Sequence, residues 1–141
     1  MTIDEVQEEI IEEFAGFDDW MDKYNYIIEL ASDLPETSED LKKPENLISG
    51  CQSKVWIDAE LKDGKIHFTA DSDAIITKGI VALLLRVVND REPKELLDFE
   101  PYFLDKIGLQ QNLSPTRANG LLSMIKKIKL YAMAYNAKLN N

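Results

Sequence analysis

The sequence is poor in the residues that most enzymes and metal sites use. Among its 141 residues it has one cysteine, Cys51, and one histidine, His67. A disulfide within the chain is therefore impossible, and a thiolate metal site would lack two or three of the soft ligands that it needs. The chain also lacks a Gly-x-Ser-x-Gly motif, a phosphate-binding loop and a dinucleotide fingerprint. A single thiol remains as the main candidate for chemistry.

Long apolar runs are missing as well. The longest covers residues 80–85 and is followed by Arg86, so it is far too short to span a membrane. The acidic N-terminus lacks the basic and apolar regions of a secretory signal. With 45% hydrophobic and 30% charged residues, we expect one folded domain over residues 1–141. We expect it in the cytoplasm, where a free thiol stays reduced.

Negative charge is concentrated in the first third of the chain. Residues 1–45 hold 15 acidic and 3 basic side chains, the net charge of the whole chain is −10, and no acidic residue follows Lys106. This acidic total argues against nucleic acid or anionic lipid as the main partner. The acidic third either steers association with a basic protein surface or forms a solvated helix face.

Helical patterns dominate both ends of the chain. Thr2 and Glu5 have the spacing of a capping box, which predicts a helix over about 3–14. Asp18 is the expected cap of a second helix that runs to about residue 33, and residues 35–50 read as a polar loop. Ser114 and Pro115 predict the start of a last helix that ends near residue 138.

The middle of the chain reads as a hairpin followed by helices. Residues 55–61 and 66–70 are rich in β-formers and flank a turn at residues 62–65, and we place Trp56 in the core. A largely apolar helix is expected over 74–89, a short helix from Pro93, and a connecting segment over 102–108. The order predicts an α+β fold with a small antiparallel sheet packed against several helices.

Cys51 lies among polar neighbours, in the sequence Ser49-Gly50-Cys51-Gln52-Ser53-Lys54. Free cysteines are usually small buried hydrophobes, but this setting favours an accessible, reactive thiol. Gly50 suits a loop that presents a side chain. Lys54 or Arg117 either lowers the pKa of the thiol or is a plain surface charge.

Two further groups have competing interpretations. His67 is the only candidate base for a cysteine hydrolase or peroxidase, although strand alternation favours a solvent-facing position. Asp71 and Asp73 are conceivable metal ligands, but a turn and capping role is far commoner for this pattern.

Several stretches of the chain resemble the SufE family of sulfur-acceptor proteins. The stretch from Ile48 to Trp56, ISGCQSKVW, looks like the family's cysteine-loop signature. Residues 71–80 (DSDAIITKGI) resemble its strand-to-helix segment, residues 113–121 (LSPTRANGL) its last-helix start, and residues 20–30 with 34–35 also fit. Ala70 stands where the family usually has glycine, and Thr116 where serine is common. The resemblance spans nearly the whole chain.

The resemblance implies that Cys51 accepts sulfane sulfur from the persulfide of a cysteine desulfurase, stimulates that enzyme and passes sulfur to iron–sulfur cluster assembly. The protein would then be a carrier rather than an enzyme, without a bound cofactor or metal, since pyridoxal phosphate belongs to the desulfurase. Its other implied partner is a cluster scaffold complex. Loop and support roles are implied for a set of neighbours: Gly50, Gln52, Ser53, Asp71, Asp73 and Arg117.

Two other function classes remain open. One is an iron–sulfur scaffold of related fold, although such scaffolds normally present three cysteines. The other is a thiol enzyme that uses Cys51 with His67. The oligomeric state is also open, either a monomer or a weak homodimer, because the last helix has enough apolar faces for a dimer but no clear seam.

Overall fold

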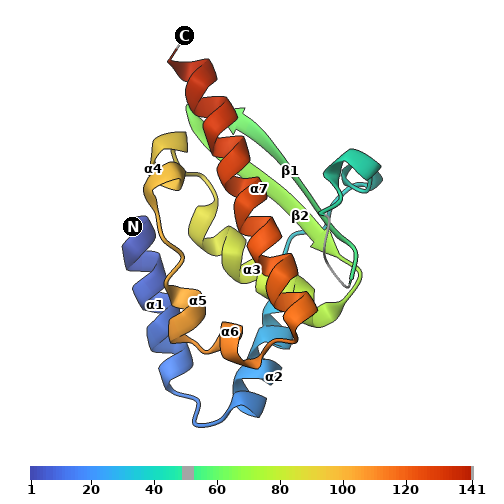
Figure 1. Ribbon diagram of the computed structural model, residues 1–141, viewed down its shortest axis with the longest axis vertical. Helices are drawn as coiled ribbons and strands as arrows, with labels where there is room; N and C mark the ends of the chain where they lie inside the picture. The colour runs from blue at the N-terminus through green and yellow to red at the C-terminus, as the bar shows by residue number, and fades with distance from the viewer. Residues whose placement is uncertain (49–52, 141) are drawn as a thin grey trace.

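The computed structural model describes residues 1–48 and 53–140. A two-stranded antiparallel sheet, β1 (Val55–Lys62) and β2 (Lys65–Ser72), packs with one face against the helices (Figure 1). The described α-helices are α1 (Ile3–Ala15), α2 (Trp20–Leu30), α3 (Ile75–Val88), α4 (Pro93–Asp98), α5 (Phe103–Lys106), α6 (Leu109–Asn112) and α7 (Pro115–Leu139). Short 3₁₀ helices are η1 (Ala31–Asp33), η2 (Glu39–Leu41) and η3 (Pro44–Asn46). The predicted α+β fold is confirmed.

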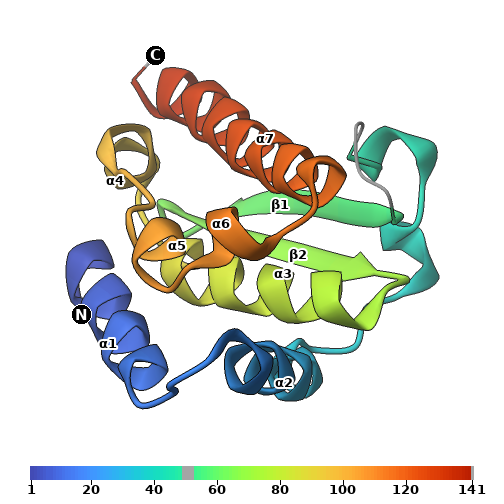
Figure 2. The same ribbon diagram turned by 60° about the horizontal axis from the view of Figure 1, so that its bottom comes forward.

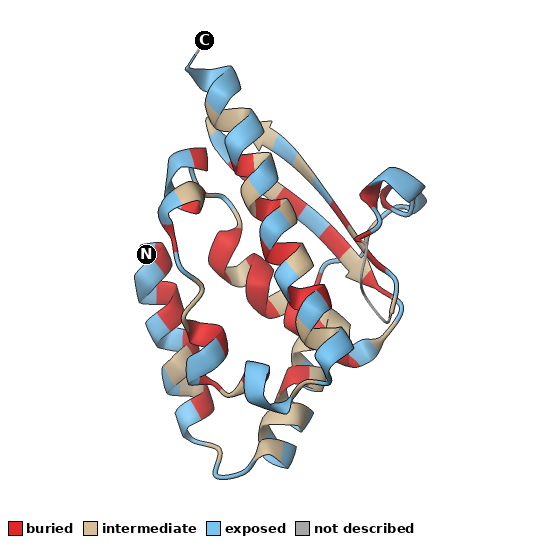
Figure 3. Ribbon diagram, in the orientation of Figure 1, coloured by how far each residue is buried: buried red, intermediate tan, exposed pale blue. Residues whose placement is uncertain are grey.

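Helix α3 lies at the centre of this arrangement. Figure 2 shows it between the hairpin on one side and α1 and α2 on the other. Helix α7 packs on the same face of the hairpin as α3, where Tyr131 contacts Phe68. Nine of the 14 residues of α3 are buried, as the red segment in Figure 3 shows. An apolar helix of this length avoids water only if other elements cover it on several sides. The core therefore forms around α3.

The hairpin presents one apolar face to the helices. Its register runs from Val55 opposite Ser72 to Lys62 opposite Lys65. Val55 and Ile57 of β1 are buried, as are alternate residues of β2, because successive side chains point to opposite faces. The two-residue turn has positive φ angles, 54° at Asp63 and 79° at Gly64, as a type I′ hairpin turn requires. The predicted hairpin and turn are confirmed.

Trp56 is not in the core as predicted. It lies between the buried Val55 and Ile57 and points to the opposite face of the sheet, where it is half-buried. The Lys42 ammonium lies 5.5 Å from the centre of its ring, a cation–π geometry that suits a partly exposed aromatic side chain. The sequence prediction failed because it put two successive strand residues on the same face.

Helix termini follow the predicted capping chemistry with one shift. Thr2 and Glu5 form the capping box of α1, and Ser114 caps α7 with Pro115 at its first position. The cap of α2 is Asp19, not Asp18, because Asp19 Oδ1 accepts the Asp22 N–H at 2.9 Å.

The segment over residues 102–108 was predicted as a connection, but it contains the short helix α5, and α6 follows it. No helix among the described residues is long and apolar enough to cross a bilayer.

Gly79 lets α3 approach α2 closely. A Cβ built at this position would overlap the Ile27 carbonyl oxygen and lie 2.8 Å from the Ile27 carbonyl carbon. Both atoms belong to backbone, which cannot rotate away as a side chain can. We expect Gly79→Ala to lower the free energy of unfolding by about 3 kcal/mol, since overpacking outweighs the gain in helix propensity.

Urea unfolding followed by circular dichroism measures this loss. Gly16→Ala is the matched control, because a Cβ there would meet the Glu13 carbonyl oxygen at an ordinary 3.8 Å. Equal stability of the Gly79→Ala variant and the wild type would show that α2 and α3 are not in close contact.

A charged network joins α1 to α3. The Arg86 guanidinium donates to Glu9 and to both oxygens of Glu13, and Tyr26 Oη donates to Glu13 Oε1 at 2.7 Å. Hydrogen bonding from Arg86 lowers the pKa of Glu13. Burial, followed by the hydrogen bond to Glu13, raises the pKa of Tyr26 to about 12. Glu13 is therefore ionised in the folded protein at neutral pH.

We expect Glu13→Gln to reduce stability at pH 7 by about 1 kcal/mol, since the pair is only partly buried. A lowered folded-state pKa contributes stability above the unfolded-state pKa, and this stability is lost as the pH falls through the folded-state pKa. The difference between wild type and Glu13→Gln should therefore shrink as the pH falls below about 4.5.

Thermal unfolding between about pH 3 and 7 tests this dependence. Glu12→Gln changes the neighbouring exposed carboxylate of α1 and serves as the control. A pH-independent difference for Glu13→Gln would contradict the ionic role.

Candidate functional site

The ends of the cysteine loop are fixed at one end of the hairpin. The Ile48 N–H donates to the Val55 carbonyl oxygen at 2.8 Å, and Leu47 forms an isolated bridge with Trp56. The predicted residues Gly50, Cys51 and Gln52 lie outside the described residues, whereas Ser53 is described and half-buried. The chain therefore enters and leaves this loop beside the start of β1.

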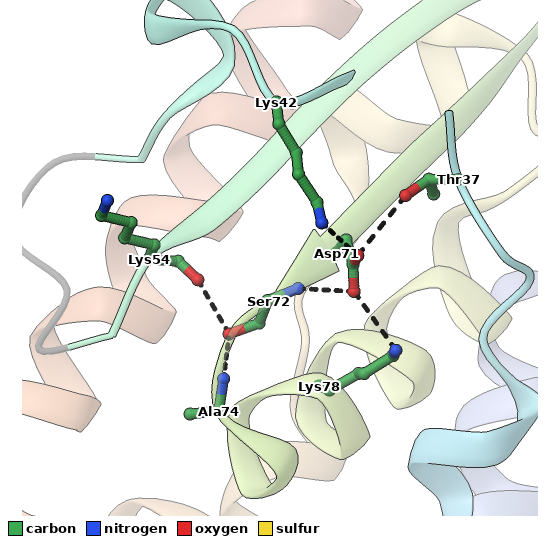
Figure 4. Close-up of polar contacts among 7 residues, drawn as sticks. All are labelled: Thr37, Lys42, Lys54, Asp71, Ser72, Ala74 and Lys78. Carbon is green, nitrogen blue, oxygen red and sulfur yellow. Dashed lines mark hydrogen bonds and ion pairs between the residues drawn. The ribbon is translucent and has the colours of Figure 1, made fainter. Parts of the chain in front are cut away.

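Lys54 is held by the end of β2 through three hydrogen bonds. Its N–H donates to Asp73 Oδ1 at 3.0 Å, and its carbonyl oxygen accepts from the Asp73 N–H at 3.2 Å. The same carbonyl accepts from Ser72 Oγ at 2.9 Å, and Ser72 Oγ also accepts the Ala74 N–H at 3.3 Å (Figure 4). The chain is thus fixed three residues after Cys51.

Asp71 connects the hairpin to two neighbouring segments. Its carboxylate lies 3.4 Å from Lys78 Nζ of α3 and 3.9 Å from Lys42 Nζ, which follows η2. Asp71 Oδ2 also accepts from Thr37 Oγ1 at 3.4 Å (Figure 4). The Asp71 side chain is 15% exposed, so its two ammonium partners compensate a largely desolvated charge.

The two aspartates have separate partners. Asp73 accepts the Lys54 N–H and Asp71 pairs with lysines. Neither caps α3, whose N-cap Ala74 has no side-chain hydrogen bond, so the predicted capping role is not observed. In the part of the chain that the structure describes, no group of three or more histidine, cysteine or acidic residues is placed to hold a metal.

Arg117 lies across a small cavity from the loop exit. The cavity has a volume of about 20 Å³, roughly the space of one water molecule. The Arg117 N–H donates to Ser114 Oγ at 3.3 Å, which fixes the first turn of α7. Its Nε is buried and has no hydrogen-bond partner among residues 1–48 and 53–140. The cavity is lined by Ser53, Val55, Thr77, Ile80, Arg117, Gly120, Leu121 and Met124.

This cavity brings together two of the predicted site residues, Ser53 and Arg117, although they are far apart in the sequence. The rest of its lining is almost entirely apolar. An apolar recess with one cationic group suits a polarisable anionic sulfur, because it excludes water and offsets negative charge.

His67 lies away from this end of the hairpin. Its register partner is Glu60 of β1, its side chain is 45% exposed, and its Nδ1 lies 3.0 Å from Asp90 Oδ1. The predicted solvent-facing position is confirmed. We did not predict Lys42, Lys78 or Ser72 as part of the site, although Lys78 lies within the strand-to-helix motif.

The class of this protein is defined by an α+β domain in which a long C-terminal helix packs on a β-hairpin and the cysteine motif immediately precedes the first strand. The model of the SufE family, described as an Fe-S metabolism associated domain, matches residues 8–132. The chain belongs to the SufE family, which confirms the resemblance found in the motifs. Membership supports a sulfur-transfer role in iron–sulfur metabolism.

Two relatives agree with this family assignment, and one solved structure agrees in fold. An uncharacterized SufE-like protein of Rhizobium etli is 39% identical over 127 residues, which are 86% of each chain. A second, from Rhizobium meliloti, is 39% identical over 127 residues, covering 86% of this chain and 91% of the relative. The solution structure of a hypothetical protein from Thermus thermophilus has a TM-score of 0.76 at 18% identity, covering 94% of this chain and 96% of the other. It supports the fold alone.

We expect Asp73→Ala to loosen the exit of the cysteine loop. The change removes the acceptor of the Lys54 N–H, and one lost hydrogen bond of about 1 kcal/mol corresponds to roughly fivefold faster exchange of the Lys54 amide. Asp73→Asn is the matched control because its side-chain oxygen still accepts. Amide exchange measured by NMR tests both, and unchanged Lys54 exchange in Asp73→Ala would argue against the anchor.

Proposed function

We propose that the chain is a sulfur carrier that takes sulfane sulfur from a cysteine desulfurase onto Cys51 and delivers it to iron–sulfur cluster assembly. The observation that carries the proposal is the family's cysteine-loop motif at a position where both loop ends are anchored, at Ile48 and at Lys54. Anchored ends limit the entropy lost when the loop meets a partner. The short segment between them contains Cys51.

The transfer is an exchange between two thiols. The Cys51 thiolate attacks the terminal sulfur of the desulfurase persulfide, a new S–S bond forms at Cys51, and the enzyme's S–S bond breaks. The leaving group is the desulfurase thiolate, and the transferred sulfur keeps its proton. The step has no net oxidation or reduction, so it needs neither a cofactor nor a metal on this chain. Pyridoxal phosphate chemistry, which releases the sulfur from cysteine, belongs to the desulfurase.

The recess beside Ser53 and Arg117 supports storage of the product. A persulfide is lost readily to small thiols in solution, and an apolar recess lowers its encounter rate with them. The Arg117 guanidinium favours the ionised form of a nearby thiol or persulfide. The volume of the recess, about 20 Å³, is close to that of a single small group, which limits the proposed storage to the outer sulfur of the persulfide.

We expect desulfurase turnover, measured as sulfide released under reductant, to rise when wild-type protein is added and not when Cys51→Ser is added. The serine hydroxyl has nearly the shape of the thiol but does not accept sulfur. Ser38→Ala is the matched control, because it removes the hydroxyl of an exposed serine outside the recess and keeps the acceptor. Mass spectrometry of wild type after turnover should show a gain of one sulfur atom.

The same assay separates the alternatives. Equal stimulation by wild type and Cys51→Ser would make the protein a docking activator and the thiol incidental. His67→Gln should stimulate as wild type does, because His67 pairs with Asp90 on the outer face of the hairpin. Loss of activity in His67→Gln would favour a thiol enzyme. Purification with iron and sulfide that yields a bound cluster would favour a scaffold.

A further inference from the structure

The outer face of α7 is apolar although it is open to solvent. Leu122, Leu130 and Met133 are 55%, 51% and 58% exposed, and the exposed residues Lys126 and Ala137 continue the same line. Successive members of this set are three or four residues apart, which places all five on one side of an α-helix. We call these five residues the α7 outer face. Figure 3 shows exposed segments along much of α7.

This face differs from the other exposed surfaces of the described chain. Single exposed apolar side chains are normal in soluble proteins, whereas a contiguous group of them marks an interaction site. Among the described residues, α2 and α3 each expose one large apolar side chain, Met21 and Ile75, whereas α7 exposes four, of which Leu139 lies outside the face. The α7 outer face is therefore the largest group of such side chains on any one described helix.

The charge around the α7 outer face is of one sign. Residues 107–141 hold five basic and no acidic side chains, whereas the whole chain has a net charge of −10. Lys126 and Lys138 are exposed and form no ion pair within residues 1–48 and 53–140. Exposed helix faces usually mix both signs. This one combines apolar contact with uncompensated positive charge.

We propose that the α7 outer face binds an acidic amphipathic helix of a partner protein. The exposed leucines and methionine receive the apolar residues of that helix, as two packed helices interdigitate along rows four residues apart. Methionine suits such a contact because its side chain adapts to the partner. Carboxylates that flank the apolar stripe of the partner helix meet Lys126 and Lys138, and no acidic residue of α7 repels them. Cys51 takes no part, so the proposal stands apart from sulfur transfer.

The charges disfavour a second copy of this chain on the same face. A symmetric contact would bring together two α7 helices that each carry lysines and no acidic residue. Like charges repel across such a pair, and no carboxylate on either helix compensates them. The complementary occupant is a helix whose charges are opposite to those of α7.

An anionic membrane also fits less well than an acidic helix. A helix that lies in a bilayer surface inserts a wide apolar face, but the opposite side of α7 is buried in the core through Leu121, Ile125 and Ile128. The outer face alone is therefore a narrow stripe. The net charge of −10 further opposes approach to an anionic surface.

NMR titration of ¹⁵N-labelled protein with a designed helix tests the proposal. The probe is a capped peptide with three copies of the heptad Ala-Leu-Glu-Ala-Glu-Leu-Ala, in which glutamates flank a leucine stripe. We expect a dissociation constant of about 0.1 mM and shifts in the amides of residues 122–137. The same peptide with glutamine in place of glutamate keeps the stripe and should bind roughly fivefold more weakly.

Two pairs of variants locate the site. Met133→Ser should weaken binding of the glutamate peptide roughly fivefold, whereas Met21→Ser, which changes a methionine of similar exposure on α2, should not. Lys126→Glu should weaken binding at least as much, and Lys106→Glu, at an exposed lysine of α5, is its control. Thermal unfolding confirms that all four variants are folded. Cys51→Ser should bind the peptide as wild type does.

Five results would overturn the proposal. Two concern the peptides: no saturable shift up to about 2 mM, and equal binding of the glutamine peptide. A third is equal loss of binding in Met133→Ser and Met21→Ser. Self-association of the protein that Met133→Ser abolishes would assign the face to a second copy. Sedimentation with phosphatidylglycerol vesicles that Met133→Ser abolishes would assign it to a membrane.

Discussion

The packing of the hairpin on α3 is the contact on which the rest of the structure depends. A two-stranded sheet alone is at best marginally stable in water, because it has only one face to bury and few cross-strand pairs. Here the buried face of β1 and β2 meets a helix that is itself covered by α1 and α2 on its opposite side. The absence of a side chain at Gly79 allows that second contact. The loop that carries Cys51 is anchored to the end of this hairpin, so its position depends on α3.

Electrostatic contacts extend this support toward the loop. Asp73 fixes Lys54 by direct hydrogen bonding, whereas Asp71 reaches Lys78 on α3 and Lys42 beyond η2. The two carboxylates lie two residues apart where β2 ends, and each binds a different segment. The acidic residues of the signature therefore hold the segments that border the loop. Under the proposed function this positioning matters more than a resident base, because the proposed reaction is a thiol exchange.

Local chemistry made much of the fold predictable from the sequence. Thr2 with Glu5, Ser114 with Pro115, and the Asp63-Gly64 turn each satisfy a backbone requirement within a few residues, and all three are present as predicted. The predictions that failed concern choices that the local sequence does not decide. Asp18 and Asp19 have the same side chain and could each cap a helix, and in the folded chain Asp19 is the residue at the cap position.

The candidate site was only partly predictable for the same reason. Asp71 and Asp73 were identified from the motif, but Lys42 comes from another segment and meets Asp71 only through the tertiary fold. Trp56 was misplaced because burial was inferred from its apolar neighbour rather than from strand alternation. The recess beside Ser53 required the approach of α7 to β1, which no local pattern reveals.

Segments that are distant in the sequence converge on one side chain beside the loop anchor. Thr37 donates a hydrogen bond to Asp71. Asp71 also contacts Lys42 beyond η2 and Lys78 of α3, so three segments meet at the carboxylate near the end of β2. A change in any of these segments therefore alters the partners of one carboxylate beside the loop anchor.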